Sequence, residues 1–365
     1  MIRSRARWVV ALVLAFGLVA AACGSDTKKG SSGGGSTSST TKPAKQLAAT
    51  TLAGSGSTFQ QAFNEAVIAQ FTAVQPAVTV TYAGGGSGQG QLDLQAGTKQ
   101  WAGSDSTIKP ADLPKYKGTV LYFPTVAAPI TISYNLSGVS KLNLSPDTVA
   151  NIFEGKIKTW DDAAIKADNP KAKLPGTTIT VVHRSDSSGT TANFTNFLTK
   201  AAPTTWTLGT GSTVSWPADT QGATGNSGVA KLVQTTDGAI GYVDFSDAKA
   251  SDLTFAAVKN SAGKFIQPNL VSAAGAADGT TINADLTYDP INAPGAGAYP
   301  ITSPTWIMVM ANQSDAAKGN AIKGFLNYIY GDGQKLASQV DYAPLPKKLL
   351  AQSKAQVKKI VVPAS

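Results

Sequence analysis

After about residue 48, runs of residues typical of strands alternate with segments whose apolar residues recur at helical spacing. This alternation predicts strands interleaved with helices. Runs rich in β-branched and aromatic residues predict strands over 77–82, 119–126, 129–135 and 178–183. Apolar residues at helical spacing predict helices over 59–71, 145–153 and 316–340, the last interrupted at 331–333. Strands that alternate with helices are typical of an α/β fold.

The first 47 residues have a different pattern. Three arginines precede an apolar run over 8–22, which is too short for an ordinary spanning helix and predicts an export signal over 1–22. Cys23, the single cysteine, follows directly after small residues, as in the lipobox of bacterial lipoproteins. We therefore expect lipidation of Cys23, with ordinary secretory cleavage as the alternative. The Gly-, Ser- and Thr-rich stretch that completes 23–47 predicts a flexible tether.

Composition indicates a chain with a real core and a modest positive charge. Hydrophobic residues make up 42% of the 365 residues, and charged residues 15%. The net charge of +9 falls to +6 without the signal, and the lysines are scattered, so we expect no nucleic-acid partner. A mild positive field favours capture of small anions, although solubility explains it equally well. One cysteine and one histidine offer no metal-ligand spacing, so no metal or other cofactor is expected.

Three Gly/Ser-rich segments stand at strand-to-helix junctions. They are "GSGSTF" (54–59), "GGGSG" (84–88) and "RSDSSGT" (184–190). Each offers free backbone N–H groups, a short hydroxyl and the positive end of a helix, which together suit an anion. The alternative for each segment is simple capping, with Ser57 or Thr58 as the cap of the first helix. No segment completes a nucleotide-binding motif.

Two carboxylates interrupt this pattern. Asp186 lies among residues suited to an anion, and Asp105 lies in a second run of small hydroxyl residues, "GSDS". Taken alone, Asp105 is typical of a turn or a helix cap. A negative charge in an anion site needs a separate explanation.

Eight segments in this order resemble one family. They are "GSGSTF", "YAGGGSG", "GSDS", "FEGKIKTWDDAAI", "RSDSSGT", "GTGSTVSWP", "GAIGYV" and "DYAPLP". Together they resemble the phosphate-binding protein of the bacterial high-affinity phosphate ABC transporter, over about 53–346. The resemblance implies a two-lobed periplasmic-binding-protein fold of type II, with the ligand cleft between lobes that close by a hinge. Lobe 1 would comprise 48–127 and 303–365, lobe 2 128–302, and the crossing strands would lie near 123–135 and 299–307.

The resemblance also implies a set of phosphate contacts. They are Thr58, Phe59, Ser87, Asp105, Arg184, Asp186, Ser188, Gly189 and Thr190. Phosphate keeps a proton near neutral pH and sulfate does not, so a buried carboxylate can accept from phosphate and repel sulfate. Asp105, Asp186 or both can take this role. The family favours Asp105, and Asp186 could instead hold Arg184 in place.

The implied function is that of a binding protein. The chain would be a lipid-anchored monomer on the outer face of the cell membrane that delivers inorganic phosphate to the permease subunits. The alternatives are a phosphatase or esterase, a phosphate sensor or adhesin, and a sulfate or molybdate receptor. A serine hydrolase would need His183, the only histidine, which we expect to be structural.

Overall fold

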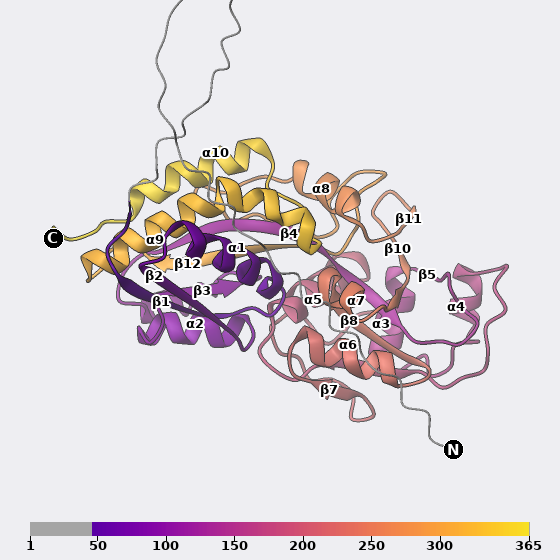
Figure 1. Cartoon of the computed structure of the whole chain (residues 1–365). Coiled ribbons are helices and arrows are strands. Elements are labelled where there is room, and N and C mark those ends of the chain that lie inside the picture. Colours follow the sequence, from indigo (N-terminus) through magenta and orange to yellow (C-terminus); the bar gives the residue numbers. More distant parts are fainter. Residues whose placement is uncertain (1–45, 365) are drawn as a thin grey trace, which may run out of the picture. The chain divides into compact units, whose positions relative to one another are not determined.

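The computed structural model describes residues 46–364 (Figure 1). Within this range, eight strands of the main sheet run in the order β2-β1-β3-β12-β4-β8-β6-β7, and β9 pairs with β4 beside this path. The strands are β1 (Thr50–Gly56), β2 (Val78–Gly84), β3 (Trp101–Ser104), β4 (Val120–Tyr134), β6 (Thr180–Arg184), β7 (Gln221–Ala223), β8 (Ala239–Asp244), β9 (Thr254–Phe255) and β12 (Thr302–Met310). A smaller sheet joins β5 (Asn143–Leu144), β10 (Ala257–Lys259) and β11 (Phe265–Ile266).

Helices connect these strands, so the predicted α/β alternation is confirmed. The α-helices are α1 (Gln61–Val74), α2 (Ser87–Ala96), α3 (Pro146–Phe153), α4 (Ala163–Asp168), α5 (Gly189–Ala201), α6 (Gly225–Thr235), α7 (Phe245–Ala250), α8 (Leu270–Asp278), α9 (Ala316–Ile329) and α10 (Lys347–Gln356). Short 3₁₀ helices cover Leu113–Lys115, Asp332–Val340 and Val357–Lys359. Among residues 46–364, none of the helices combines the length and the apolar character needed to cross a bilayer.

Each end of the main sheet is parallel. The unit β1-α1-β2-α2-β3 pairs β1 with both β2 and β3 in parallel, and the unit β6-α5-β7-α6-β8 pairs β6 with β7 and β8 in the same way. In such sheets the carboxyl ends of the strands and the amino ends of the following helices lie at one edge. The Gly/Ser-rich junctions of the sequence fall at these edges.

Strand β4 links the two parallel units. Its first part pairs antiparallel with β12, up to Pro129 opposite Thr302, and its last part pairs antiparallel with β8, from Ile130 onward. Figure 1 shows β4 passing from the region of β12 to that of β8. Two separate strands over 119–126 and 129–135 were therefore the wrong prediction. Pro129 does not end the strand because it lies where the strand changes partners, at the junction of two hydrogen-bond ladders.

The helix predictions were correct in extent and partly wrong in capping. The Ser145 hydroxyl caps α3 by accepting from the Thr148 N–H, and the C-terminal helical segment is interrupted after Ile329, as predicted. Helix α1 instead has Gln60 at its N-cap with no side-chain cap, so capping by Ser57 or Thr58 is wrong. Both hydroxyls have partners elsewhere, as described below. The predicted signal (1–22) and most of the Cys23 tether (23–47) lie outside the described residues.

Candidate functional site

Residues of three junctions that are distant in sequence lie within hydrogen-bonding reach of one another. The Ser87 hydroxyl, at the start of α2, accepts from the Asp105 N–H at 3.1 Å. Gly189 begins α5, and a Cβ placed there would meet both the Ser87 hydroxyl and the Asp105 side chain. Thr58 Oγ1 and Thr190 Oγ1 both lie 3.1 Å from the same end of one carboxamide, that of Asn226. The first-turn N–H groups of α5 have no partner within the helix, so this edge favours negative charge.

Arg184 and Asp186 form a two-pronged ion pair at the end of β6. The Arg184 Nε donates to Asp186 Oδ1 at 2.7 Å, and Nη2 pairs with Oδ2. The Arg184 side chain is 1% exposed and that of Asp186 14%. Burial alone would raise the pKa of Asp186, but the hydrogen bonds and charge of Arg184 hold that pKa below its ordinary value. Both carboxylate oxygens of Asp186 are thus engaged within the protein.

Asp105 is in the opposite situation. It lies after β3 and is only 2% exposed, and its Oδ2 accepts from the Ser57 and Ser87 hydroxyls. Its Oδ1 is buried and has no hydrogen-bond partner within the described part of the chain. Burial raises the pKa of Asp105 to about 6, although the neighbouring hydroxyls of Ser57, Thr305 and Ser87 and the charge of Arg184 oppose the rise. A buried acceptor without a donor is costly unless a ligand supplies one.

The remaining site residues predicted from the sequence offer hydroxyl or backbone N–H groups, several of which are already engaged within the protein. The Phe59 N–H donates to the Ser57 hydroxyl at 3.0 Å. Ser188 is the N-cap of α5, and its hydroxyl accepts from the Thr191 N–H at 3.1 Å. Thr190 Oγ1 lies 3.4 Å from Arg184 Nη1. Thr58 Oγ1 accepts from the Asn226 backbone N–H at 3.2 Å. The Ser188 hydroxyl oxygen therefore accepts a capping hydrogen bond from α5. The hydroxyl could contribute to a ligand by donating its own hydrogen.

Glycines let the second junction approach the third. Gly86 has φ +87°, in the left-handed region that glycine tolerates, and a Cβ there would meet the Asp186 carboxylate. The Gly88 N–H donates to the Ser187 carbonyl at 3.0 Å, which joins the start of α2 to the segment after β6. A cavity of about 560 Å³ opens beside this contact and is lined on one side by α2 and on the other by Asp186 and Ser187.

Sequence reasoning missed three participants. Asn226 is fully buried at the start of α6, the Gly225 N–H donates to Asp186 Oδ1 at 3.1 Å, and Ser57 bonds Asp105. The stretch "TGNSG" (224–228) has the composition of the other junctions, which was the available signal. It was overlooked because β7 has only three residues and no apolar run.

The side chain of His183, which directly precedes Arg184, is engaged by its own neighbours. The His183 ring stacks on Trp216 at 4.9 Å between centroids, and its Nδ1 lies 2.9 Å from the Arg184 carbonyl oxygen. Burial lowers its pKa. Among residues 46–364, no group of three or more His, Cys, Asp or Glu side chains is arranged to hold a metal ion.

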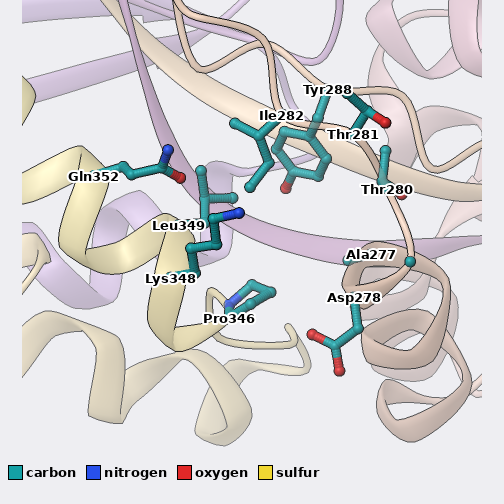
Figure 2. Close-up of a pocket in the computed structure, with 11 residues that line it drawn as sticks. Ala277, Asp278, Thr280, Thr281, Ile282, Tyr288, Pro346, Lys348, Leu349 and Gln352 are labelled. Carbon is teal, nitrogen blue, oxygen red and sulfur yellow. The ribbon is translucent and has the colours of Figure 1, made fainter.

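A second cavity lies apart from the predicted site residues. Figure 2 shows it between helix α10 and the end of α8 with the loop that follows α8. The cavity has a volume of about 500 Å³. The Tyr288 hydroxyl and Gln352 Oε1 lie in its wall and have no hydrogen-bond partner within the described residues. None of the nine residues implied by the sequence resemblance lines this cavity.

The fold and the arrangement of these junctions identify the class of protein, that of two-lobed binding proteins. A model of the PBP superfamily domain matches residues 37–332, and the chain belongs to this superfamily of two-lobed binding proteins. It is 37% identical over 320 residues to the phosphate-binding protein PstS of Xylella fastidiosa (strain Temecula1), covering 86% of each chain. It is 35% identical to PstS 2 of Mycobacterium tuberculosis (strain H37Rv), covering 98% of this chain and 99% of that one. The chain belongs to the family of PstS phosphate-binding proteins.

A solved structure supports the fold. The structure of a high-affinity periplasmic phosphate-binding protein, PfluDING, bound with phosphate, superposes with a TM-score of 0.71. The match covers 84% of this chain and 94% of that chain at 24% sequence identity. The predicted α/β, two-lobed periplasmic-binding-protein architecture is thereby confirmed.

Proposed function

We propose that the protein binds inorganic phosphate outside the cytoplasm and delivers it to an ABC permease. The relatives named above are phosphate-binding proteins. One observation of this chain carries the proposal further: Asp105 Oδ1 is a buried acceptor without a donor within the described residues, and Asp105 is bonded to Ser57 and Ser87 of the first two junctions. Phosphate suits this site because its negative charge is attracted to the donors of the junctions. It also still holds a proton, which it can donate to Asp105.

The two carboxylates would have separate roles. Asp105 would accept the ligand proton through its free Oδ1, while Asp186, engaged by Arg184, would orient the guanidinium. Sulfate at the same pH lacks the proton, so it would leave Asp105 unpaired and repelled. A site built to pair with a ligand hydrogen rejects the analogue that lacks it by about 10⁴–10⁵.

The remaining contacts would grip the other phosphate oxygens. Arg184 would supply a charge-assisted hydrogen bond, and most other donors would be neutral. They are Thr58, Phe59, Ser87, Ser188, Gly189 and Thr190. Neutral donors stabilise an anion without burying many full positive charges. A site with few positive charges favours release of phosphate once the cleft opens.

Closure of two lobes would sequester the ligand. Lobe 1 would comprise 48–127 and 303–365 and lobe 2 128–302, and the change of β4 partners from β12 to β8 at Pro129 supports this division. The contacts of Gly88 with Ser187 and of Thr58 with Asn226 would then cross the cleft. Both would separate when the lobes open about the crossing strands.

The anchoring of the protein remains a proposal from the sequence. Cys23 would carry the lipid after removal of the signal, and residues up to 47 would tether a monomeric binding domain to the outer face of the membrane. A hydrolase is the less favoured alternative. The His183 Nδ1 faces a backbone carbonyl and its ring stacks on Trp216, which supports a structural role for this histidine.

Isothermal calorimetry tests the proposed function. The processed protein, purified in mild detergent and stripped with a phosphate-scavenging enzyme, would be titrated with phosphate and then with sulfate near pH 7. Tight phosphate binding without sulfate heat is expected. A stripped, folded protein that gave no phosphate heat would end the phosphate assignment, and turnover of a chromogenic phosphate ester would point instead to the hydrolase.

A further inference from the structure

Asn226 occupies a central position among the donors of the site. It is fully buried at the start of α6. One end of its carboxamide lies 3.1 Å from both Thr58 Oγ1 and Thr190 Oγ1. The same atom lies 3.2 Å from the Phe59 N–H nitrogen and 3.3 Å from Arg184 Nη1. Four groups from two distant segments therefore converge on one side-chain atom.

The chemistry of the neighbours decides which end of the carboxamide faces them. A backbone N–H and a guanidinium can only donate hydrogen bonds, whereas a threonine hydroxyl can do either. The Asn226 amide oxygen, not its nitrogen, therefore faces Phe59 and Arg184, since the opposite orientation would set donors against donors. In this orientation the oxygen accepts from a cluster of four donors.

The carbonyl oxygen has two lone pairs, so it cannot satisfy all four neighbours at once. The Phe59 N–H has a second acceptor in the Ser57 hydroxyl, at 3.0 Å. Arg184 Nη1 and the two threonine hydroxyls therefore keep donor capacity that a ligand oxygen could use. The donors come from the β1–α1 junction, with Thr58 and Phe59, and from the β6–α5 region, with Arg184 and Thr190.

We propose that Asn226 is a positioning residue of the anion site, a clasp that joins the two junctions and holds their donors at the spacing of a ligand oxygen. This inference rests on the proposed function for the identity of the anion. The sequence separation of 168 residues between Thr58 and Asn226 shows that the clasp is a tertiary contact. The backbone N–H of Asn226 also donates a hydrogen bond to the Thr58 hydroxyl and so helps to orient it.

The clasp has to be neutral. An aspartate at 226 would have nearly the same shape and could accept the same hydrogen bonds. It would also place a further carboxylate beside Arg184, which already pairs with Asp186, and its charge would oppose a bound anion. The amide offers the acceptor oxygen without that repulsion.

Asn226→Ala and Asn226→Asp test the clasp, with inorganic phosphate as the probe. Calorimetry and chase of bound radiolabelled phosphate by unlabelled phosphate would give affinity and dissociation rate. We expect phosphate affinity to fall at least about tenfold in N226A, mainly through faster dissociation, because oriented donors are lost. N226D should bind more weakly still.

A matched variant separates positioning from stability. Asn260 is also buried, and its carboxamide holds the 295–298 loop through Gly295 and Ala298. Asn260→Ala should lower the melting temperature and leave phosphate affinity unchanged. Affinity in N226A or N226D equal to that of the wild type, or higher, would overturn the clasp.

Melting temperatures measured without phosphate distinguish the role of Asn226 from the proposed phosphate-binding function. The melting temperatures of N226A, Thr58→Val and the double variant form a cycle, and the clasp predicts that the two shifts are not additive. Additive shifts would overturn it. If the wild type bound no phosphate while the cycle showed coupling, the proposed function would fail and the clasp would stand for another anion.

Discussion

Arg184 and Asp186, two residues apart at the end of β6, pair through both prongs of the guanidinium, whereas Asp105 leaves one carboxylate oxygen without a donor. The site therefore contains one carboxylate whose hydrogen bonds are satisfied inside the protein and one whose bonding is incomplete. This difference separates two functions that the same residue type can perform. It also makes each of them testable by an Asp-to-Asn change.

Asp105→Asn should reduce the preference for phosphate over sulfate. The new amide can donate to an unprotonated oxygen, and it removes the negative charge that repels sulfate. Given discrimination of about 10⁴–10⁵ in sites of this design, we expect the affinity ratio to fall by about a hundredfold or more. Competitive calorimetry with both anions measures the ratio. An unchanged ratio would transfer the discriminating role to Asp186.

Asp186→Asn should weaken both anions together. Arg184 would lose its fixed orientation and keep an uncompensated, nearly fully buried charge, which we expect to cost about 3 kcal/mol of stability. Urea unfolding measures the stability, and calorimetry the two affinities. Asp219→Asn is the matched control, because the pair of Asp219 with Lys158 is exposed and its loss should leave both anion affinities unchanged. Selective loss of phosphate alone would contradict the orienting role.

The raised pKa of Asp105 predicts a pH-dependent selectivity. Above its pKa of about 6, the carboxylate accepts from phosphate and repels sulfate. Below that value it becomes protonated and can donate to either anion. Selectivity should therefore decline as the pH falls below about 6, and it should be nearly independent of pH in D105N. Titration of both proteins at several pH values measures this, and parallel profiles would contradict it.

The same pKa has a consequence for the protein without ligand. A raised pKa means that between its ordinary value of 3.8 and about 6 the folded chain keeps a proton that the unfolded chain has released. The stability contributed by this group is thus largest at low pH and falls as the pH rises through that window. The free energy of unfolding of the wild type, measured relative to D105N, should decrease from pH 4 to pH 6 and then level off. An increase over that range would show that Asp105 ionises easily.

Local sequence was sufficient to predict the junctions but not their connections. Arg184, Asp186 and the start of α5 are adjacent in the chain, so their residue types indicated an anion site. Whether the Asp186 side chain turns to Arg184 depends on the backbone at Ser185, which no pattern of residue types encodes. The sequence therefore left the roles of the two aspartates open, and the hydrogen bonds of the folded chain differ between them.

Tertiary contacts also explain the wrong capping prediction. Ser57 is well suited by type to cap α1, but its hydroxyl donates to Asp105, which lies 48 residues further along the chain. Thr58 is bonded to Asn226, separated from it by 168 residues. A local rule fails where the site uses the same group for a distant partner. For Asn226 the sequence did carry a local signal in the composition of 224–228, but nothing near it in sequence reveals its contacts with Arg184 and Phe59.

Gly189→Ala should impair binding without unfolding the protein. In the first turn of a helix alanine is ordinarily tolerated, but a Cβ at 189 would lie within 2.8 Å of Asp105 Oδ2 and closer still to the Ser87 hydroxyl. The start of α5 would have to move away from Asp105. We therefore expect phosphate affinity to fall by about tenfold or more, which corresponds to a loss of about 1.4 kcal/mol of binding free energy.

Gly228→Ala provides the control for that substitution, because it adds the same methyl group to α6, where the nearest atom is the Ala223 Cβ at 3.5 Å. That is an ordinary contact, and the change should stabilise the helix by about 0.5–1 kcal/mol and leave affinity unchanged. Calorimetry and thermal unfolding of both variants separate the outcomes. Equal phosphate affinity in G189A and G228A would show that the amino end of α5 need not approach Asp105 closely, and that the two junctions do not hold one ligand between them.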